Sequence, residues 1–103
     1  MNVGKMMKDL QRAREDLEKR LAEMRIEGSA GGGLVKAVVD GQKQLHSVAF
    51  GSGAVDPNDL EMLQDLVVAA VNDAGRRADE ESKALMNRLM GPLSGGMNIS
   101  GLF

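Results

Sequence analysis

Apolar side chains recur every three or four positions along residues 3–24, and this spacing predicts an amphipathic helix. The same spacing returns in the last third of the chain and continues to Gly91 and Pro92, which are expected to end a second, longer helix. Asp56 followed by Pro57 is a typical helix start, because Asp accepts a hydrogen bond from a free N–H group and Pro has no N–H group to satisfy. Two long helices are therefore predicted.

Between the helices the apolar spacing is two, which is typical of β-strands. Residues 34–40 and 45–50 alternate in this way, and the Asp-Gly pair at 40–41 provides the left-handed backbone that a tight reversal needs. A shorter strand is expected over residues 24–28, because the three glycines at 31–33 let the chain bend sharply before the hairpin. The predicted fold class is α+β, with the order long helix, three-stranded antiparallel sheet, long helix (α-β-β-β-α).

Length and composition limit the classes of protein that this chain can be. Its 103 residues suit one domain, which is predicted to cover residues 1–92 and to be followed by a flexible tail at 93–103. The chain has no cysteine, so a disulfide framework and thiolate chemistry are excluded. The longest apolar run, residues 66–71, is far shorter than the roughly 20 residues that a bilayer requires, and the N-terminus lacks a secretory signal. We expect a cytoplasmic protein without membrane contact.

Candidate catalytic chemistry is sparse. His46 is the only histidine, and no partner for a metal site or a general base can be located by spacing. The glycine run at 31–33 is not followed by the Lys-Ser or Lys-Thr pair of a phosphate loop, so a strand bend is favoured. No enzymatic activity, metal, cofactor or small-molecule substrate is predicted.

The charge pattern favours a nucleic-acid partner only if positive charge is locally segregated, because the net charge is −2. The first predicted helix carries basic residues on the side opposite its apolar stripe, and the second carries them in its second half. Carboxylates four residues away, such as Asp9 after Lys5, allow local ion pairs. An ordinary solvated helix surface fits the same pattern, and the sequence leaves both interpretations open.

The second helix is long for the predicted sheet. About 33 helical residues span roughly 50 Å, whereas three adjacent strands cover about 14 Å. The remaining apolar surface must be covered by the first helix or by a second copy of the chain, because a bare apolar stripe would aggregate. We therefore predict a homodimer in which the sheets or the helix bases form a two-fold contact.

Two motifs carry a recognisable pattern. Residues 27–41 read Glu-Gly-Ser-Ala-Gly-Gly-Gly-Leu-Val-Lys-Ala-Val-Val-Asp-Gly, and residues 61–74 read Glu-Met-Leu-Gln-Asp-Leu-Val-Val-Ala-Ala-Val-Asn-Asp-Ala. Together with the intervening Asp-Pro pair at 56–57, they resemble the YbaB/EbfC family of bacterial nucleoid-associated proteins. The resemblance covers nearly the whole chain. It implies the α-β-β-β-α order, a homodimer shaped like tweezers whose protruding helices engage double-stranded DNA, and neither cofactor nor catalysis.

The resulting hypothesis is a nucleoid-associated protein that binds double-stranded DNA mainly through phosphates, with little sequence selectivity, and organises the chromosome. The predicted DNA-binding residues are Lys5, Lys8, Arg12, Lys19, Arg76, Arg77, Lys83 and Arg88. The alternative is a non-enzymatic adaptor whose helical arms bind other proteins. Partners that are retained after nuclease treatment would favour the adaptor.

Overall fold

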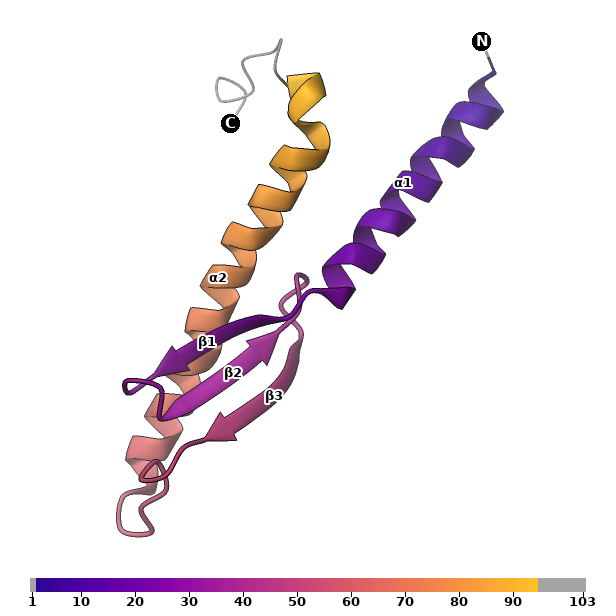
Figure 1. The fold of residues 1–103 in the computed structure, drawn as a ribbon. Helices are drawn as coiled ribbons and strands as arrows, with labels where there is room; N and C mark the ends of the chain where they lie inside the picture. The colour runs from indigo at the N-terminus through magenta and orange to yellow at the C-terminus, as the bar shows by residue number, and fades with distance from the viewer. Residues whose placement is uncertain (1, 95–103) are drawn as a thin grey trace.

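The structure is a computed structural model and describes residues 2–94 (Figure 1). Its elements in chain order are α1 (Val3–Glu23), β1 (Ile26–Ala30), β2 (Val35–Val39), β3 (Leu45–Phe50) and α2 (Leu60–Ser94). The strands form one antiparallel sheet in the order β1-β2-β3. The predicted α+β class and the order of elements are confirmed.

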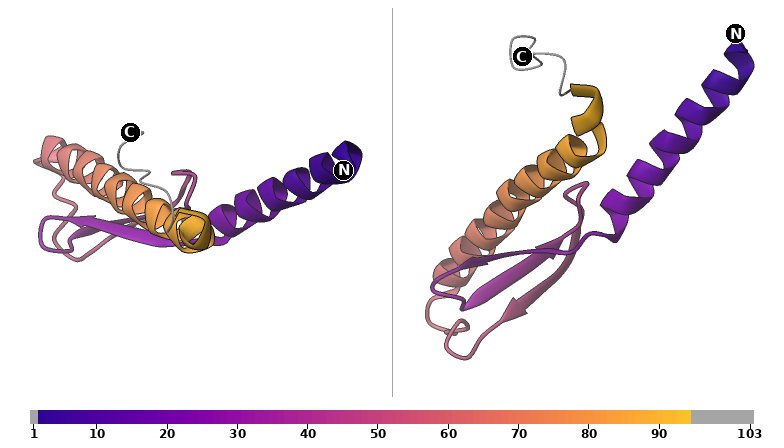
Figure 2. Two further views of the ribbon diagram at one scale, coloured as in Figure 1. Left: turned by 90° about the horizontal axis from the view of Figure 1, so that it is seen from above. Right: turned by 45° about the horizontal axis from the view of Figure 1, so that its top comes forward.

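The core lies between α2 and one face of the sheet (Figure 2). It comprises Ile26, Val35, Ala37, Val39, Ala54, Ala70, Ala74 and Ala78. The two-residue spacing along β2 predicted its three core positions, because alternate side chains of a strand share a face. Small side chains let α2 approach β1 closely. A Cβ atom added at Gly28 would lie 2.6 Å from the carbonyl oxygen of Ala70 and closer still to the backbone nitrogen of Ala74.

The third strand is only partly covered. Phe50 pairs with Val35 across the sheet, so both side chains point toward the face on which α2 lies. Val35 is fully buried, yet Phe50 is 50% exposed, because α2 packs on β1 and β2. An apolar part of the sheet face therefore remains open along β3.

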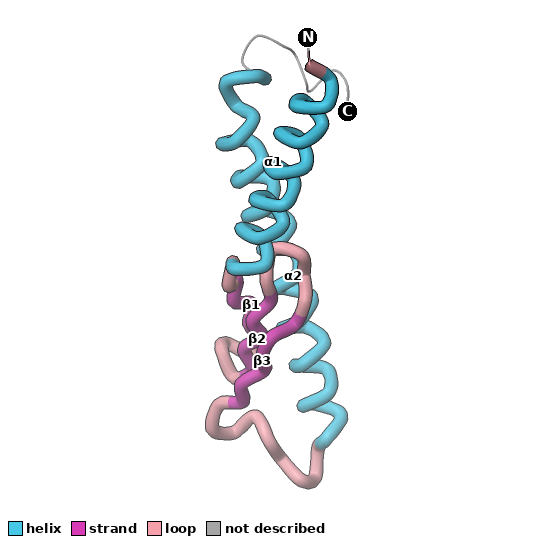
Figure 3. Tube along the Cα trace, turned by 90° about the vertical axis from the view of Figure 1, so that its right-hand side faces the viewer, coloured by secondary structure: helices cyan, strands magenta, loops and turns pink. Residues whose placement is uncertain are grey.

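Both helices extend beyond the same end of the sheet (Figures 1 and 3). No residue of α1 is buried, and α1 approaches the rest of the described chain only near its C-terminal end, where Leu21 and Met24 are half-buried. The radius of gyration is 19.0 Å, against about 13 Å for a compact domain of this length. The first helix thus does not cover the remainder of α2, which was one of the two predicted alternatives.

The predicted start of α2 is wrong by about one turn. The helix begins at Leu60, and Asp59 is its cap, because Asp59 Oδ1 accepts a hydrogen bond of 3.0 Å from the N–H group of Met62. Asp56 Oδ1 instead accepts from the N–H group of Asn58, at 2.9 Å, and holds a preceding turn. Two aspartates three residues apart offer the same capping chemistry, and sequence alone did not separate them.

The predicted end of α2 is also wrong, because the helix continues through Gly91 and Pro92 to Ser94. Most of the tail predicted at residues 93–103 lies outside the described residues. Gly75 lies inside α2, as the sequence indicates, and the helix continues through it without a break.

The turns of the sheet differ in how well they were predicted. Gly31, Gly32 and Gly33 all have positive φ and make the predicted bend between β1 and β2. The predicted tight Asp-Gly reversal after β2 is wrong. The connection covers residues 40–44, and Lys43 is the residue with the left-handed backbone, at φ 66°. The first strand begins at Ile26, two residues later than predicted.

Candidate nucleic-acid interface

The basic residues predicted on α1 lie on one exposed side of the helix. At 3.6 residues per turn, Lys5, Lys8, Arg12 and Lys19 lie opposite the apolar stripe that contains Val3 and Leu10, and all four are exposed. The helix is ordered from its first turn, because Asn2 Oδ1 accepts a hydrogen bond of 3.1 Å from the N–H group of Lys5. Its projecting position makes this side accessible along its length.

The ion pairs that the sequence allows along this side do not form within residues 2–94. They are Lys5–Asp9, Arg12–Asp16 and Lys19–Glu23. The ion pair present on α1 is Arg14–Glu18, with Arg14 Nε 3.3 Å from Glu18 Oε1. Unpaired lysines and arginines keep their full charge available to an external anion.

The basic residues predicted on α2 fall into two groups. Arg76 Nη2 lies 3.5 Å from Asp73 Oδ1, and Arg77 Nε lies 3.1 Å from Asp73 Oδ2. The same Oδ2 atom accepts a hydrogen bond of 3.0 Å from the N–H group of Ser29, which holds β1 to the helix. Of the i to i+4 pairs that the sequence allows on α2, Asp73–Arg77 forms, whereas Arg76–Glu80 and Asp79–Lys83 do not form within residues 2–94. Both arginines are tied to a structural contact.

The pKa of the Asp73 carboxyl group is lowered, first by the hydrogen bond from Ser29 and then by Arg77 and Arg76, while partial burial acts in the opposite direction. Lys83 and Arg88 differ from the two arginines. Both are exposed and form no ion pair with another described residue. The predicted set on α2 therefore contains two free cations and two that already have a carboxylate partner.

Charge is separated along the length of the molecule. We define the positive end as residues 3–14 of α1 and 83–94 of α2, the parts of both helices that extend farthest from the sheet (Figure 1). It carries six lysines and arginines and one aspartate, a surplus of five positive charges. Residues 15–82 carry seven lysines and arginines and fourteen aspartates and glutamates, an excess of seven negative charges. The net charge of −2 thus conceals two regions of opposite sign.

The cations of the positive end are Lys5, Lys8, Arg12, Arg14, Lys83 and Arg88. Arg14 is not among the predicted residues, because it lies beside the apolar stripe and not on the opposite side of α1, and it is already paired with Glu18, which lies outside the positive end. The predicted residues Lys19, Arg76 and Arg77 lie instead in the acidic region. Counting charges along the sequence could have shown the excess in each helix, but only the fold shows that the two basic segments lie at the same end.

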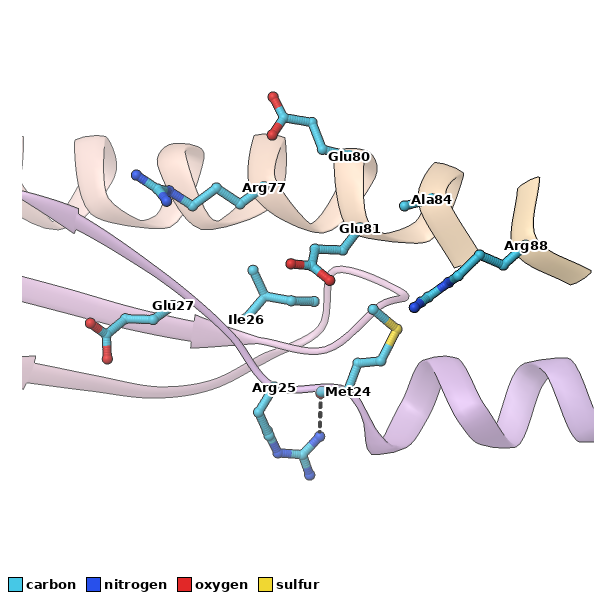
Figure 4. A pocket seen from close by; sticks show the side chains of 9 residues that line it. All are labelled: Met24, Arg25, Ile26, Glu27, Arg77, Glu80, Glu81, Ala84 and Arg88. Carbon is cyan, nitrogen blue, oxygen red and sulfur yellow. Dashed lines mark hydrogen bonds between the residues drawn. The ribbon is translucent and has the colours of Figure 1, made fainter. Parts of the chain in front are cut away.

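A cleft at the base of the two arms contrasts with the positive end (Figure 4). Its walls come from the connection between α1 and β1, the start of β1 and α2. Its lining includes three glutamates and three arginines, one of which, Arg88, also belongs to the positive end. Arg25 is already occupied there, because its Nη1 atom donates hydrogen bonds of 2.8 Å to the carbonyl oxygens of Ala22 and Met24. Balanced charge and an engaged arginine make this cleft a poor site for an anion.

His46 has a partner that sequence spacing did not reveal. His46 Nε2 lies 2.9 Å from Asp40 Oδ2, and Asp40 Oδ1 accepts hydrogen bonds from the N–H groups of Gln42 and Gln44. These contacts lower the pKa of Asp40, the hydrogen bond from His46 most of all, and the carboxylate is almost completely buried. Within residues 2–94 no three His, Cys, Asp or Glu side chains are grouped as metal ligands. The pair braces the turn after β2.

No helix in the described part of the chain is both long and apolar enough to cross a bilayer. The two long helices instead project from a small sheet and concentrate positive charge at their far ends. This arrangement defines an α-β-β-β-α protein with two basic helical arms.

The chain belongs to the YbaB/EbfC DNA-binding family, whose family model matches residues 1–93. It is 46% identical over 105 residues to a nucleoid-associated protein of Alkaliphilus metalliredigens, covering 99% of this chain and 89% of that protein. A nucleoid-associated protein of Geobacillus kaustophilus is 52% identical over 83 residues, covering 81% of this chain and 73% of that protein. The predicted family membership is confirmed.

The fold has a counterpart among solved structures. The crystal structure of an uncharacterized protein from Helicobacter pylori matches with a TM-score of 0.70 and 20% identity, covering 87% of this chain and 98% of that chain. At this identity the likeness concerns the fold alone.

Proposed function

We propose that this protein binds double-stranded DNA through the positive end of its helical arms and organises chromosomal DNA in the nucleoid of the cytoplasm. The observation that carries the proposal is the separation of charge, with a surplus of five positive charges where α1 and α2 extend from the sheet. Phosphates attract such a surface regardless of base sequence, so binding has little sequence selectivity. Membership of a DNA-binding family and the names of the nucleoid-associated relatives support the same partner.

The contributions of the predicted residues follow from their surroundings. Lys5, Lys8 and Arg12 contact phosphates most strongly, because they are exposed and unpaired within the described chain, and Lys5 also lies in the first turn of α1, where the helix end is positive. Lys83 and Arg88 act from α2. The remaining predicted residues, Lys19, Arg76 and Arg77, contribute less, since carboxylates surround them or pair with them.

A duplex suits this surface better than a single strand. Proteins that hold single strands stack bases on aromatic rings. The chain has two aromatic residues, Phe50 and Phe103, and Phe50 lies on the sheet, away from the positive end. Lysine and arginine without interleaved rings favour contacts to the phosphates on the outside of a duplex.

The functional unit is a homodimer. The stripe on α1 leaves Val3 65% and Leu10 63% exposed, and Val68 on α2 is 59% exposed. Most of the stability of a helix in a protein comes from packing of its apolar face, and residues 2–94 do not bury that face of α1, so α1 needs a further partner. A second copy covers the open apolar surface at β3 and along the helices by a two-fold contact, and it doubles the positive charge presented to DNA.

The salt dependence of binding to a random-sequence duplex tests the proposal. If a dimer neutralises about eight phosphates, the logarithm of affinity falls with the logarithm of salt concentration with a slope near −7. The double variant Lys8→Ala, Arg12→Ala removes about four contacts per dimer and should reduce the slope by roughly 3.6. A slope that stays unchanged would exclude these two residues from the DNA-binding surface.

A matched control removes the same charge from the acidic region. Lys36 pairs with Glu27 on the sheet, and Lys43 pairs with Asp79 beside the turn after β2. The double variant Lys36→Ala, Lys43→Asn should leave the slope unchanged, and asparagine suits the left-handed backbone at position 43. An equal reduction of the slope in both double variants would indicate a response to net charge and not to a defined surface.

The adaptor alternative depends on the same exposed stripe of α1. An affinity pull-down with and without nuclease distinguishes the two functions. If other proteins remain bound at equal levels after nuclease treatment, the arms recognise protein. If they are lost with the nucleic acid, the DNA-binding proposal is supported.

A further inference from the structure

One residue in the turn after β2, Gly41, forms backbone hydrogen bonds to both helices. The N–H group of Gly41 donates a hydrogen bond of 2.8 Å to the carbonyl oxygen of Leu21, in the last turn of α1. The carbonyl oxygen of Gly41 accepts a hydrogen bond of 2.9 Å from Ser82 Oγ on α2. The turn therefore lies between the bases of the two arms and is bonded to each of them.

The fit around Gly41 is close on the side of α1. A Cβ atom at this position would lie 2.9 Å from the carbonyl oxygen of Leu21 and 3.0 Å from the sulfur of Met24. Two residues, Met24 and Arg25, connect α1 to β1, and no residue of α1 is buried. Within one chain, the direction of α1 is consequently determined by this short connection and by the contact with Gly41.

The turn itself is stiff. Asp40 is 2% exposed, and its carboxylate accepts hydrogen bonds from the backbone of Gln42 and Gln44 and from His46. The N–H group of Asp40 donates to the carbonyl oxygen of Gln44 at 3.0 Å. Lys43 Nζ lies 3.4 Å from Asp79 Oδ1 and adds a second link to α2. A turn braced in this way can transmit the position of α2 to α1.

We propose that residues 40–44 are a clamp that sets the separation between the basic ends of α1 and α2, and thereby the spacing of DNA phosphates that the protein can engage. The second part of this inference rests on the proposed DNA-binding function; the first part does not. Gly41 and Ser82 are positioning residues, because they lie at the base of the arms and act through the helices.

The length of the arm amplifies small changes at the clamp. A helix of 21 residues is roughly 32 Å long, so a rotation of about 10° at its base moves its far end by roughly 5 Å. This displacement is close to the width of the minor groove of DNA, about 6 Å. If the clamp is loosened, the separation between the arms should vary more, and many of these separations should match the spacing of DNA phosphates poorly.

Distances between spin labels on the two arms test the clamp without DNA. The chain has no cysteine, so Gln11→Cys and Asn87→Cys provide two unique labelling sites, both exposed. Labelled protein is diluted tenfold with unlabelled protein, so that nearly all labelled dimers contain a single labelled chain, and the distance distribution is measured by pulsed electron resonance. Ser82→Ala removes the hydrogen bond between α2 and Gly41 and should broaden the distribution of distances between the labels. Gly41→Ala should shift the mean of this distribution.

A variant within the same turn is the control. Gln42→Ala keeps the backbone N–H group that Asp40 binds and removes an exposed side chain, so it should leave the distribution unchanged. If Ser82→Ala and Gly41→Ala also leave it unchanged, the clamp is refuted, whatever the affinity for DNA. Should Gly41→Ala fail to fold, Ser82→Ala alone decides the question.

The link to DNA is measured separately with a random 30-base-pair duplex. We expect Ser82→Ala to weaken binding about threefold to tenfold, with the salt slope retained because no phosphate contact is removed. A broadened distribution with unchanged affinity would overturn the link between arm spacing and DNA while leaving the clamp intact. Whether DNA binds to the positive end at all is tested independently, by the salt slope of the double variant Lys8→Ala, Arg12→Ala.

Discussion

The two helices meet the rest of the molecule in opposite ways. Ala70, Ala74 and Ala78 of α2 are fully buried against the sheet, whereas α1 buries none of its residues although its apolar stripe is regular over seven positions. Small side chains on α2 allow close contact with a strand of the same chain. The larger leucine and methionine side chains of α1 remain free to contact another chain. An apolar stripe thus predicts a helix, but not what covers it.

The largest effect is expected where α2 touches β1. Gly28→Ala places a Cβ atom against the backbone of Ala74, and neither backbone can move away without opening the core. We expect a loss of about 3 kcal/mol or more in the free energy of unfolding, measured by urea denaturation. A loss below about 1 kcal/mol would show that α2 is held less closely than its contacts indicate.

The next effect concerns the uncovered stripe of α1. Leu10→Ala removes an apolar side chain that a second copy is proposed to bury, a contact worth about 1.5–3 kcal/mol. The dissociation constant of the dimer should rise by roughly 10-fold to 100-fold in sedimentation equilibrium. Gln11→Ala, on an exposed neighbour outside the stripe, should leave the constant unchanged. Equal constants for both variants would place the dimer contact elsewhere.

A smaller effect of opposite sign is expected inside α2. Gly75 lies next to Ala74 in the same helix, but a Cβ atom there would meet nothing within 4 Å. Gly75→Ala should therefore raise the free energy of unfolding by about 1 kcal/mol, because alanine favours the helix. Paired with Gly28→Ala, this variant shows whether the close contact is confined to one side of α2. A destabilised Gly75→Ala protein would contradict that picture.

The smallest expected effect is the loss, at low pH, of stability from the contact between β1 and α2. The pKa of Asp73 in the folded state lies below its ordinary value of 3.8, so the unfolded state binds more protons. The stabilisation from the Asp73 carboxylate is present above the ordinary pKa of 3.8 and is lost as the pH falls through the lower pKa of the folded protein. Asp73→Asn should flatten the decrease in melting temperature below about pH 4. Asp65→Asn, at an exposed site of α2, is the matched control.

Local patterns predicted much of the fold. The apolar spacing predicted α1 over 3–24, and the structure has it over Val3–Glu23; the alternation predicted β3 at its observed bounds and the buried face of β2. These features depend on hydrogen bonds and side-chain directions that repeat along a few neighbouring residues. Sequence is informative about such features because their period is written in the chain itself.

The sequence alone determined the class of fold, the family and the residue types that could meet DNA. Only the tertiary structure decided which cations are free. It joins Asp73 to Ser29 and Ser82 to Gly41, residues more than forty positions apart, and it brings the basic segments of α1 and α2 to one end. The physical reason is that a charge or a hydrogen-bonding group acts over a few ångströms in space, whatever its separation along the chain.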